Sequence, residues 1–320
     1  MKKYILMLFA MVIAFASCTN DDITITRATS FKINPSTVIA PFTYEVNAGE
    51  LEGIPSSYKL RIRLLIYTAE GDLVKEEESL YTSYASTMAV NTYLAKGDYI
   101  AIAISDIVSN DKETTYWDLS NYDMLSTTTI TKTDWIGDYG REILGVAKSE
   151  FSVLDDNSQE IKIDIKPAGS LFLVRYWGVQ RFKDVISYEL AVSKIIDDCK
   201  FDKQGNFTPT WENCEFKRRI NVHKTEGNTG NNYYHYAYVL PTNNLKLKYR
   251  AWLVSEEYYD ITPEMNVSPK AGEEYCVIVD LDEWGYTAPY LINNEGRSIQ
   301  TKLESKAEHK DVNYLKDLVW

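Results

Sequence analysis

Cys18 is the residue of this sequence best placed for covalent chemistry. It follows an uncharged apolar run of thirteen residues, Tyr4–Ala16, which has two lysines before it and a serine after it. Such a run is shorter than the roughly 20 residues that cross a bilayer as a helix, and its charged start is typical of a secretory signal peptide. We predict that residues 1–17 are removed, which would leave the nucleophilic thiol of Cys18 at the new N-terminus.

The residues Phe15-Ala16-Ser17-Cys18 resemble a bacterial lipobox, in which the cysteine thiol takes a diacylglycerol. Acyl chains such as palmitate contribute about 0.8 kcal/mol per buried CH2, so lipidation would hold the protein on a membrane without a spanning segment. Asp21 and Asp22 then resemble the surface-export signal of Bacteroidetes lipoproteins. We expect an outer-membrane lipoprotein exposed on the cell surface. The alternative is an ordinary signal peptide followed by a chance cysteine.

Three cysteines remain after Cys18. Cys199 and Cys214 are fifteen residues apart around a polar loop, a spacing that would allow a disulfide in an oxidising compartment. Cys276 lies in an apolar strand-like run and is predicted to be a small buried side chain. No pair has the CxxC spacing of a metal or redox site, so none of these thiols is expected to be a nucleophile.

The other polar residues predict neither a catalytic nor a metal centre. His223 and His235 lie twelve residues apart on separate strand-like segments, with His309 near the end of the chain, and no third ligand accompanies the pair. Four carboxylates without EF-hand spacing are expected to be solvated loop charges: Asp155, Asp156, Asp197 and Asp198. Five tryptophans could stack on sugars but more often fill cores: Trp117, Trp135, Trp177, Trp211 and Trp252. GxSxG, HExxH and a phosphate-binding glycine loop are missing from the sequence, so we expect no enzyme and no cofactor.

The charge of the chain narrows the choice of partners. The 320 residues include 34 Lys plus Arg and 46 Asp plus Glu, a formal charge of −12. Such an acidic surface argues against nucleic acid, which needs basic side chains to contact phosphates. It would not be drawn to an anionic membrane either, so the predicted membrane contact depends on the acyl chains.

The elements that carry these residues have a hydrophobic period of two. In Tyr58–Tyr67, alternate residues from Leu60 to Ile66 are aliphatic, and Lys59, Arg61 and Arg63 fall on the other face, as in a strand with one buried face. Tyr99–Ile104 is apolar on both faces, which predicts a central strand. Further alternating runs with turn residues between them predict β-sandwiches: Ile161–Ile165, Tyr233–Val239, Leu245–Ala251 and Glu274–Leu281.

A faint internal repeat suggests two similar domains. A turn glycine followed by a strand-opening tyrosine occurs once in each half, in Ala95–Tyr99 and in Lys270–Tyr275. The polar stretch at 155–158 is the expected boundary. We predict a lipidated linker (18–30), an N-terminal sandwich (31–157), a C-terminal sandwich (158–284) and a tail (285–320). Ile299, Leu303 and Ala307 recur every four residues in that tail, as in a short helix that packs on the second domain, docks on a neighbour or frays as a free end.

The order of short motifs along the chain resembles the fimbrillin superfamily of Bacteroidetes, and most closely its lipidated anchor and accessory members (the FimB type). After the lipobox, the motifs that carry this resemblance are Glu70-Gly71-Asp72-Leu73-Val74, Leu94-Ala95-Lys96-Gly97-Asp98-Tyr99, Glu142-Ile143-Leu144-Gly145, Tyr238-Val239-Leu240-Pro241-Thr242 and Ala271-Gly272-Glu273-Glu274-Tyr275. The family usually has proline where Ala95 stands.

The resemblance implies two transthyretin-like β-sandwich domains, no catalysis, and a role as a fimbrial anchor or accessory subunit that binds pilin subunits by strand addition. In pilin members, a protease cut after a basic residue removes an N-terminal strand. Arg27 stands at the corresponding place, although the segment around it also suits a plain tether. A glycan-binding surface lipoprotein of a polysaccharide-uptake system is the alternative function.

Overall fold

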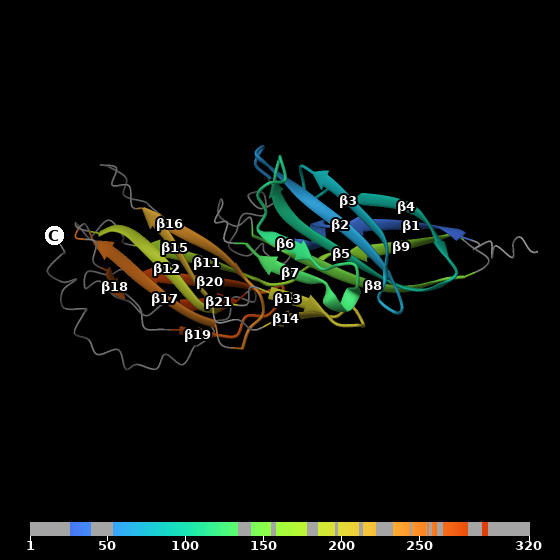
Figure 1. Cartoon of the computed structure of the whole chain (residues 1–320). Helices are drawn as coiled ribbons and strands as arrows, with labels where there is room; N and C mark the ends of the chain where they lie inside the picture. Colours follow the sequence, from blue (N-terminus) through green and yellow to red (C-terminus); the bar gives the residue numbers. More distant parts are fainter. Residues whose placement is uncertain are drawn as a thin grey trace, which may run out of the picture.

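The computed structural model in Figure 1 is built almost entirely of strands. It describes residues 26–39, 54–133, 142–154, 158–177, 185–195, 198–210, 214–221, 233–243, 245–253, 255, 258–260, 265–280 and 290–293. Within these ranges the helical elements are two single 3-10 turns, Ser36–Val38 and Leu125–Thr127, so the predicted all-β class is confirmed. None of the described residues forms a helix of the length and apolarity that a membrane crossing requires.

The N-terminal sandwich begins with two sheets. The first, called here the β1 sheet, has the order β4 (Met88–Ala95), β1 (Thr26–Asn34), β9 (Gln159–Asp164), with β1 antiparallel to β4 and parallel to β9. The second, called the middle sheet, is antiparallel and has the order β10 (Lys166–Pro167), β8 (Gly145–Val153), β5 (Gly97–Ser109), β2 (Tyr58–Thr68), β3 (Leu73–Tyr81).

A third sheet covers the other face of the middle sheet, and half of it comes from the C-terminal half of the chain. Its order is β14 (Phe207–Thr210), β13 (Asp198–Phe201), β7 (Thr129–Lys132), β6 (Trp117–Ser120). The β13–β14 hairpin pairs with β7 in register, with Cys199 opposite Ile130. At the hairpin tip, a side chain on Gly205 would touch Ile100 and Ile102 of β5. The N-terminal sandwich is therefore a stack of three layers (Figure 1).

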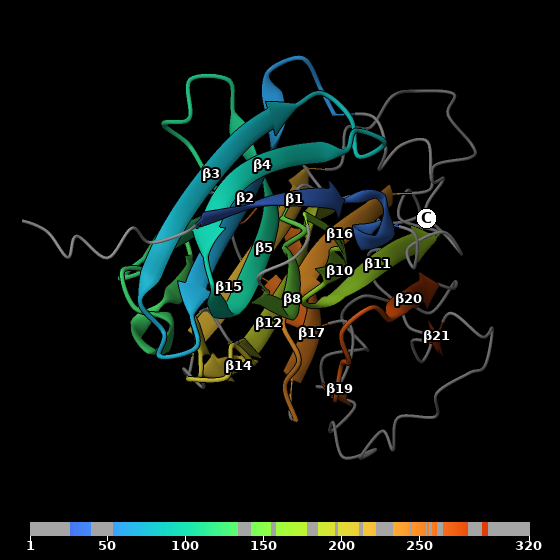
Figure 2. The same ribbon diagram turned by 90° about the vertical axis from the view of Figure 1, so that its right-hand side faces the viewer.

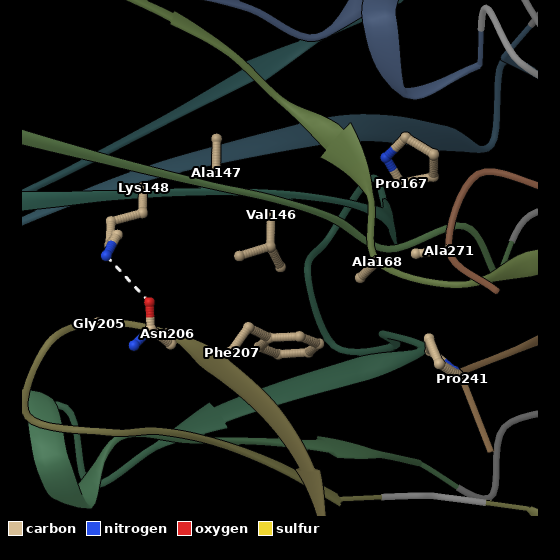
Figure 3. Close-up of a pocket in the computed structure, with 10 residues that line it drawn as sticks. All are labelled: Val146, Ala147, Lys148, Pro167, Ala168, Gly205, Asn206, Phe207, Pro241 and Ala271. Atoms are coloured by element: carbon tan, nitrogen blue, oxygen red, sulfur yellow. Dashed lines mark hydrogen bonds between the residues drawn. The ribbon is translucent and has the colours of Figure 1, made fainter. Parts of the chain in front are cut away.

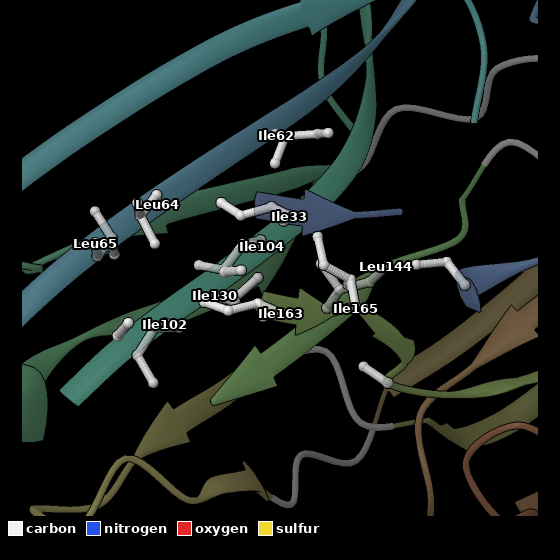
Figure 4. Close-up of a cluster of buried hydrophobic side chains, with 14 of the residues drawn as sticks. Ile33, Ile62, Leu64, Leu65, Ile102, Ile104, Ile130, Leu144, Ile163 and Ile165 are labelled. Atoms are coloured by element: carbon white, nitrogen blue, oxygen red, sulfur yellow. The ribbon is translucent and has the colours of Figure 1, made fainter. Parts of the chain in front are cut away.

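The three layers explain why β5 is apolar on both faces, as the sequence predicted for Tyr99–Ile104: ten consecutive residues, Tyr99–Val108, are buried. On β2, the predicted inner face is confirmed, since Leu60, Ile62, Leu64 and Ile66 are fully buried. Figure 4 shows Ile62 and Leu64 in the buried cluster that also contains Ile33 of β1. The expectation that the other face of β2 meets solvent was wrong at Arg61, which is 5% exposed. The third sheet covers this face, a long-range contact that alternation along one strand does not reveal.

The C-terminal sandwich repeats the plan of the first two sheets. One of its sheets has the order β16 (Tyr233–Val239), β11 (Ser170–Trp177), β20 (Glu274–Asp280), β21 (Tyr290–Asn293). The other has the order β15 (Cys214–Asn221), β12 (Val185–Ile195), β17 (Leu245–Leu253), β18 (Tyr258–Asp260). In this second sheet, β19 (Met265–Val267) also pairs with β17. Like β1, β11 is antiparallel to one neighbour and parallel to the other. Two similar sandwiches are thus present.

The two sequence motifs that suggested the repeat occupy different positions in it. Gly97 opens β5 in the middle sheet, whereas Gly272 precedes β20, the counterpart of β9. A glycine turn followed by a tyrosine is therefore a general way to open a strand here, since both glycines have positive φ, and not a mark of equivalent positions.

The strand pairing also locates the change from one sandwich to the next. β9 and β10 follow the predicted boundary at residue 157, yet they pair with β1 and β8 of the N-terminal sandwich. By pairing, the C-terminal sandwich begins with β11 at Ser170. Part of the predicted tail is a strand, β21, which pairs with β20, and the expected helix around Ile299–Ala307 lies outside the described residues.

Tyr238 joins the two sandwiches. Its buried hydroxyl donates a hydrogen bond to the Leu144 carbonyl at 2.7 Å and accepts one from the Gly169 amide. Its ring packs edge-on against Trp117 with centroids 6.5 Å apart. A Cβ on Gly169 would lie 2.4 Å from the Val239 carbonyl oxygen, so only glycine fits at this crossing. The junction is a packed, hydrogen-bonded core and not a bare linker.

Candidate functional site

β1 contains Arg27, the residue after which the family resemblance implied a protease cut that removes a strand. The place that β1 occupies, called here the β1 slot, lies between β4 and β9, and Figure 2 shows β1 beside β4 at one end of the molecule. Thr29, Phe31 and Ile33 point into the core, and the Phe31 ring meets Phe151 of β8 edge-on at 5.4 Å. The slot is filled by the protein's own strand.

Arg27 lies at the second residue of β1, half-buried and opposite Leu94. A cut after Arg27 would leave Ala28–Asn34, most of β1, in the slot. The next basic residue, Lys32, is itself inside the strand, and the sequence has no lysine or arginine from residue 33 to residue 58. A protease specific for basic residues therefore meets no site between β1 and β2 that would release β1 whole.

The edges of the sheets differ in how they are guarded against pairing with another chain. β3 carries four consecutive charged residues, Lys75–Glu78, and β9 presents charged side chains at Glu160, Lys162 and Asp164. β4 is eight residues long, pairs with β1 alone among the described residues, and carries no charge or proline. Charges and prolines normally block strand addition at an edge. This edge was not predicted, although the uncharged alternation of Met88–Ala95 could have revealed it.

Polar groups buried under the third sheet are held by structural contacts. Arg61 makes two hydrogen bonds to Asp106, Nε to Oδ1 at 2.9 Å and Nη2 to Oδ2 at 2.6 Å. Lys132 pairs at 2.9 Å with Glu142, whose carboxylate is buried. The Tyr67 hydroxyl donates to the Tyr122 carbonyl at 3.0 Å, and burial raises the pKa of Tyr67 to about 12. Each group thus has a partner inside the protein and serves the packing of the layers.

The described tryptophans are tied into the fold. Trp117 is 2% exposed and donates its indole N–H to the Glu142 carbonyl. Trp252 is half-buried and donates to Glu189 Oε2 at 3.0 Å. Beside it, Tyr258 is 47% exposed, with its ring centroid 5.1 Å from Trp252 at an angle of 45°. Trp135, Trp211 and the side chain of Trp177 lie outside the described residues.

A pocket of about 470 Å³ lies where β8, the hairpin tip and two loops of the C-terminal sandwich meet (Figure 3). Val146, Phe207 and Pro241 make much of its lining apolar. At one end, Lys148 Nζ donates to Glu150 Oε1, to the Gln204 carbonyl and to Asn206 Oδ1 at 2.9–3.0 Å. The lysine therefore fastens the hairpin tip to β8.

The structure places few of the other sequence-predicted residues. Cys199 is buried on β13, and Asp198 beside it is half-buried rather than a solvated loop charge. The remaining residues, or their side chains, lie outside what the structure describes: Cys18, Cys214, Cys276, Asp155, Asp156, Asp197, His223, His235 and His309. Among the side chains that are described, no three His, Cys, Asp or Glu residues gather as they would around a metal ion.

Comparison with known proteins finds the same fold in solved structures. No known family model matches the sequence, and no curated protein matches it. A candidate polysaccharide-binding protein from Bacteroides thetaiotaomicron matches with a TM-score of 0.57 over 87% of this chain and 100% of that chain, at 10% identity. A candidate adhesin from the same organism matches with a TM-score of 0.54 over 86% of this chain and 98% of that chain, at 11% identity. These likenesses establish the shared two-sandwich fold.

Proposed function

We propose that the protein is a cell-surface lipoprotein, held in the outer membrane by acyl chains on Cys18, that serves as a fimbrial anchor or accessory subunit and binds pilin subunits by strand addition. The signal-peptide and lipobox pattern of residues 1–18 supports the membrane attachment. The fold, shared with a candidate adhesin, supports a role in holding other molecules.

The observation that carries this proposal is the filled β1 slot. A subunit whose slot could be emptied would be able to accept a strand from the next subunit and extend a fibre. Here β1 pairs along both sides, and the connection to β2 offers no basic residue for cleavage. A subunit that keeps its own strand suits the end of a fibre, which is the position of an anchor.

The uncharged β4 edge is our choice for the contact with a pilin. Its outward side chains are Ala89, Asn91 and Tyr93, and Tyr93 is 72% exposed. An added strand would gain backbone hydrogen bonds to β4, and Tyr93 would provide a large contact surface.

A pull-down with the purified chain tests this contact. We expect pilin subunits from the same cells to be retained, and Asn91→Lys to abolish retention because a lysine on the edge opposes strand addition. The matched control is Glu160→Lys on the β9 edge, which should leave retention unchanged. Equal retention by the wild type and Asn91→Lys would remove β4 from the proposal, and no retention by the wild type would overturn the fimbrial function.

Mass spectrometry of the native N-terminus separates an anchor from a processed pilin. An anchor retains an acylated Cys18, whereas a pilin processed after Arg27 would begin at Ala28. Detection of the shorter chain alone would contradict the anchor role.

Glycan binding is the second candidate, and one cluster favours it. On the β12–β17–β18 side of the C-terminal sandwich, the Arg250 guanidinium lies 4.6 Å from the Tyr258 ring centroid and pairs with Glu189 at 3.2 Å. An exposed ring beside polar groups is a common platform for a sugar. If polysaccharide is retained by the wild type and lost in Tyr258→Ala, this function takes precedence.

A further inference from the structure

We propose that the fold is built to carry tension, through two pairs of parallel strands that act as shear clamps in series. A shear clamp here means two adjacent parallel strands that are pulled lengthwise from opposite ends. The first clamp is β1 with β9, and the second is β11 with β20. The inference relies on the proposed function only for the membrane attachment before β1. The opposing pull is a load on the C-terminal sandwich, since a load on β4 alone would act on the β1–β4 pair and would not shear β1 along β9.

The geometry of the first clamp follows from its register. Six residue pairs, from Thr29↔Gln159 to Asn34↔Asp164, join β1 to β9 in parallel. The chain enters β1 at Thr26 and leaves β9 at Asp164 toward the C-terminal sandwich. Because the strands are parallel, these two points lie at opposite ends of the ladder. A pull on the N-terminal segment against the C-terminal half therefore slides β1 along β9 and strains the whole row of hydrogen bonds together.

The other contacts of β1 resist the same movement. On its second side, β1 pairs with β4 over eight residues, from Thr26↔Ala95 to Ile33↔Met88. Sliding β1 would also draw Phe31 and Ile33, both fully buried, across the core. The backbone ladders and the side-chain packing must therefore fail in one step.

The C-terminal sandwich repeats this arrangement. Seven residue pairs, from Leu171↔Glu274 to Trp177↔Asp280, join β11 to β20 in parallel. The chain enters this sandwich at Ser170, and β20 ends at Asp280, again at opposite ends of the ladder. Tension between residues 26 and 280 thus crosses both clamps, with the Tyr238 junction between them.

Single-molecule force spectroscopy on the full mature chain tests the inference by pulling one molecule in two directions. Handles on click-reactive residues at positions 26 and 164 shear β1 along β9. Handles at positions 26 and 96 pull at one end of the antiparallel β1–β4 pair and separate its hydrogen bonds one after another, which makes this the matched control. We expect rupture forces several-fold higher in the first direction. Handles at positions 26 and 280 should give two high-force events, one for each clamp.

Equal forces in the two directions, or a lower force between 26 and 164, would overturn the inference. A single high-force event between 26 and 280 would remove the second clamp. These outcomes do not depend on pilin binding: a chain that retains no pilin but ruptures at high force in shear would contradict the proposed function and leave the clamps in place.

Discussion

The two faces of the middle sheet are closed in different ways. The inner face is aliphatic, with Leu60, Ile62, Leu64 and Ile66 toward β1, and the described strands that cover it belong to the N-terminal sandwich. The outer face carries the Arg61–Asp106 pair, and the sheet that covers it takes two of its four strands from the β13–β14 hairpin. One face is thus sealed by nearby chain and the other by the distant half of the molecule.

The source of that hairpin explains how the two similar sandwiches come to differ. In the N-terminal sandwich, β2 and β3 are joined by a tight turn, Ala69–Asp72. At the corresponding place between β12 and β15, the C-terminal sandwich inserts β13 and β14. The N-terminal sandwich has its own insertion, β6 and β7, between β5 and β8. The third sheet is built where these two insertions pair, so it binds the halves together as well as closing the core.

Removal of the hairpin should have the largest effect. Replacing residues 198–210 with a turn like Ala69–Asp72 would expose Ile100, Ile102 and Ile130. Each large side chain that loses its cover costs about 1.5–3 kcal/mol, and a domain is stable by only about 5–15 kcal/mol. We expect rapid proteolysis of the N-terminal sandwich and loss of its cooperative thermal transition. Lys203→Ala at the exposed hairpin tip should leave both readouts unchanged. A deletion variant that melts like the wild type would show that the third sheet is dispensable.

Loss of the buried ion pair should be the next largest effect. Asp106→Ala would leave the Arg61 guanidinium buried without its carboxylate, which typically costs about 3–5 kcal/mol. Urea denaturation would measure this loss. Asp118→Ala on neighbouring β6 removes an exposed carboxylate and should change the unfolding free energy by less than about 0.5 kcal/mol. If the two variants lost similar amounts of unfolding free energy, the unpaired Arg61 guanidinium would cost no more under the third sheet than a charge in water.

Acid should weaken the open edge of the middle sheet by a smaller amount. Burial opposes the charge of Glu78, but hydrogen bonds from Lys112 and Arg63 outweigh it and lower the pKa of this carboxyl from its ordinary 4.5. Its contribution to stability is therefore present above that ordinary value and is lost as the pH falls through the lowered one. We expect Glu78→Gln to cost at most about 1 kcal/mol at neutral pH, and the difference from the wild type to vanish in acid. A difference that is the same at both pH values would contradict the ionic origin.

The smallest expected effect is a gain on the inner face. The Thr29 hydroxyl is buried in β1 without a hydrogen-bond partner among the described residues. Thr29→Val keeps the shape and removes the unsatisfied oxygen, so we expect the unfolding free energy to rise by up to about 1 kcal/mol. The same substitution at Thr26, which is exposed at the start of the strand, should have no effect. A destabilised Thr29→Val variant would mean that the hydroxyl has a partner after all.

The candidate site was only partly predictable. Arg27 was identified from its sequence context as a possible cleavage site. The structure places it at the second residue of β1, so a cut there would shorten this strand. That β1 stays filled depends on its pairing with β4 and β9, which lie about 60 and 130 residues farther along the chain. The exposed Tyr258 was missed because a tyrosine in an aromatic-rich chain carries no sign of its own exposure.

The strand-forming runs, the inner face of β2 and the burial of both faces of β5 could be predicted from the residues alone, because period-two alternation is a local property of each strand. The two similar halves were predicted from motifs that occupy different positions in them. Three features became visible in the folded chain alone: β9 and β10 belong to the first sandwich, Arg61 is buried, and a hairpin from the second half closes the core of the first. These features depend on which distant strands pair, and a strand's own residues specify that it needs cover without specifying which segment supplies it.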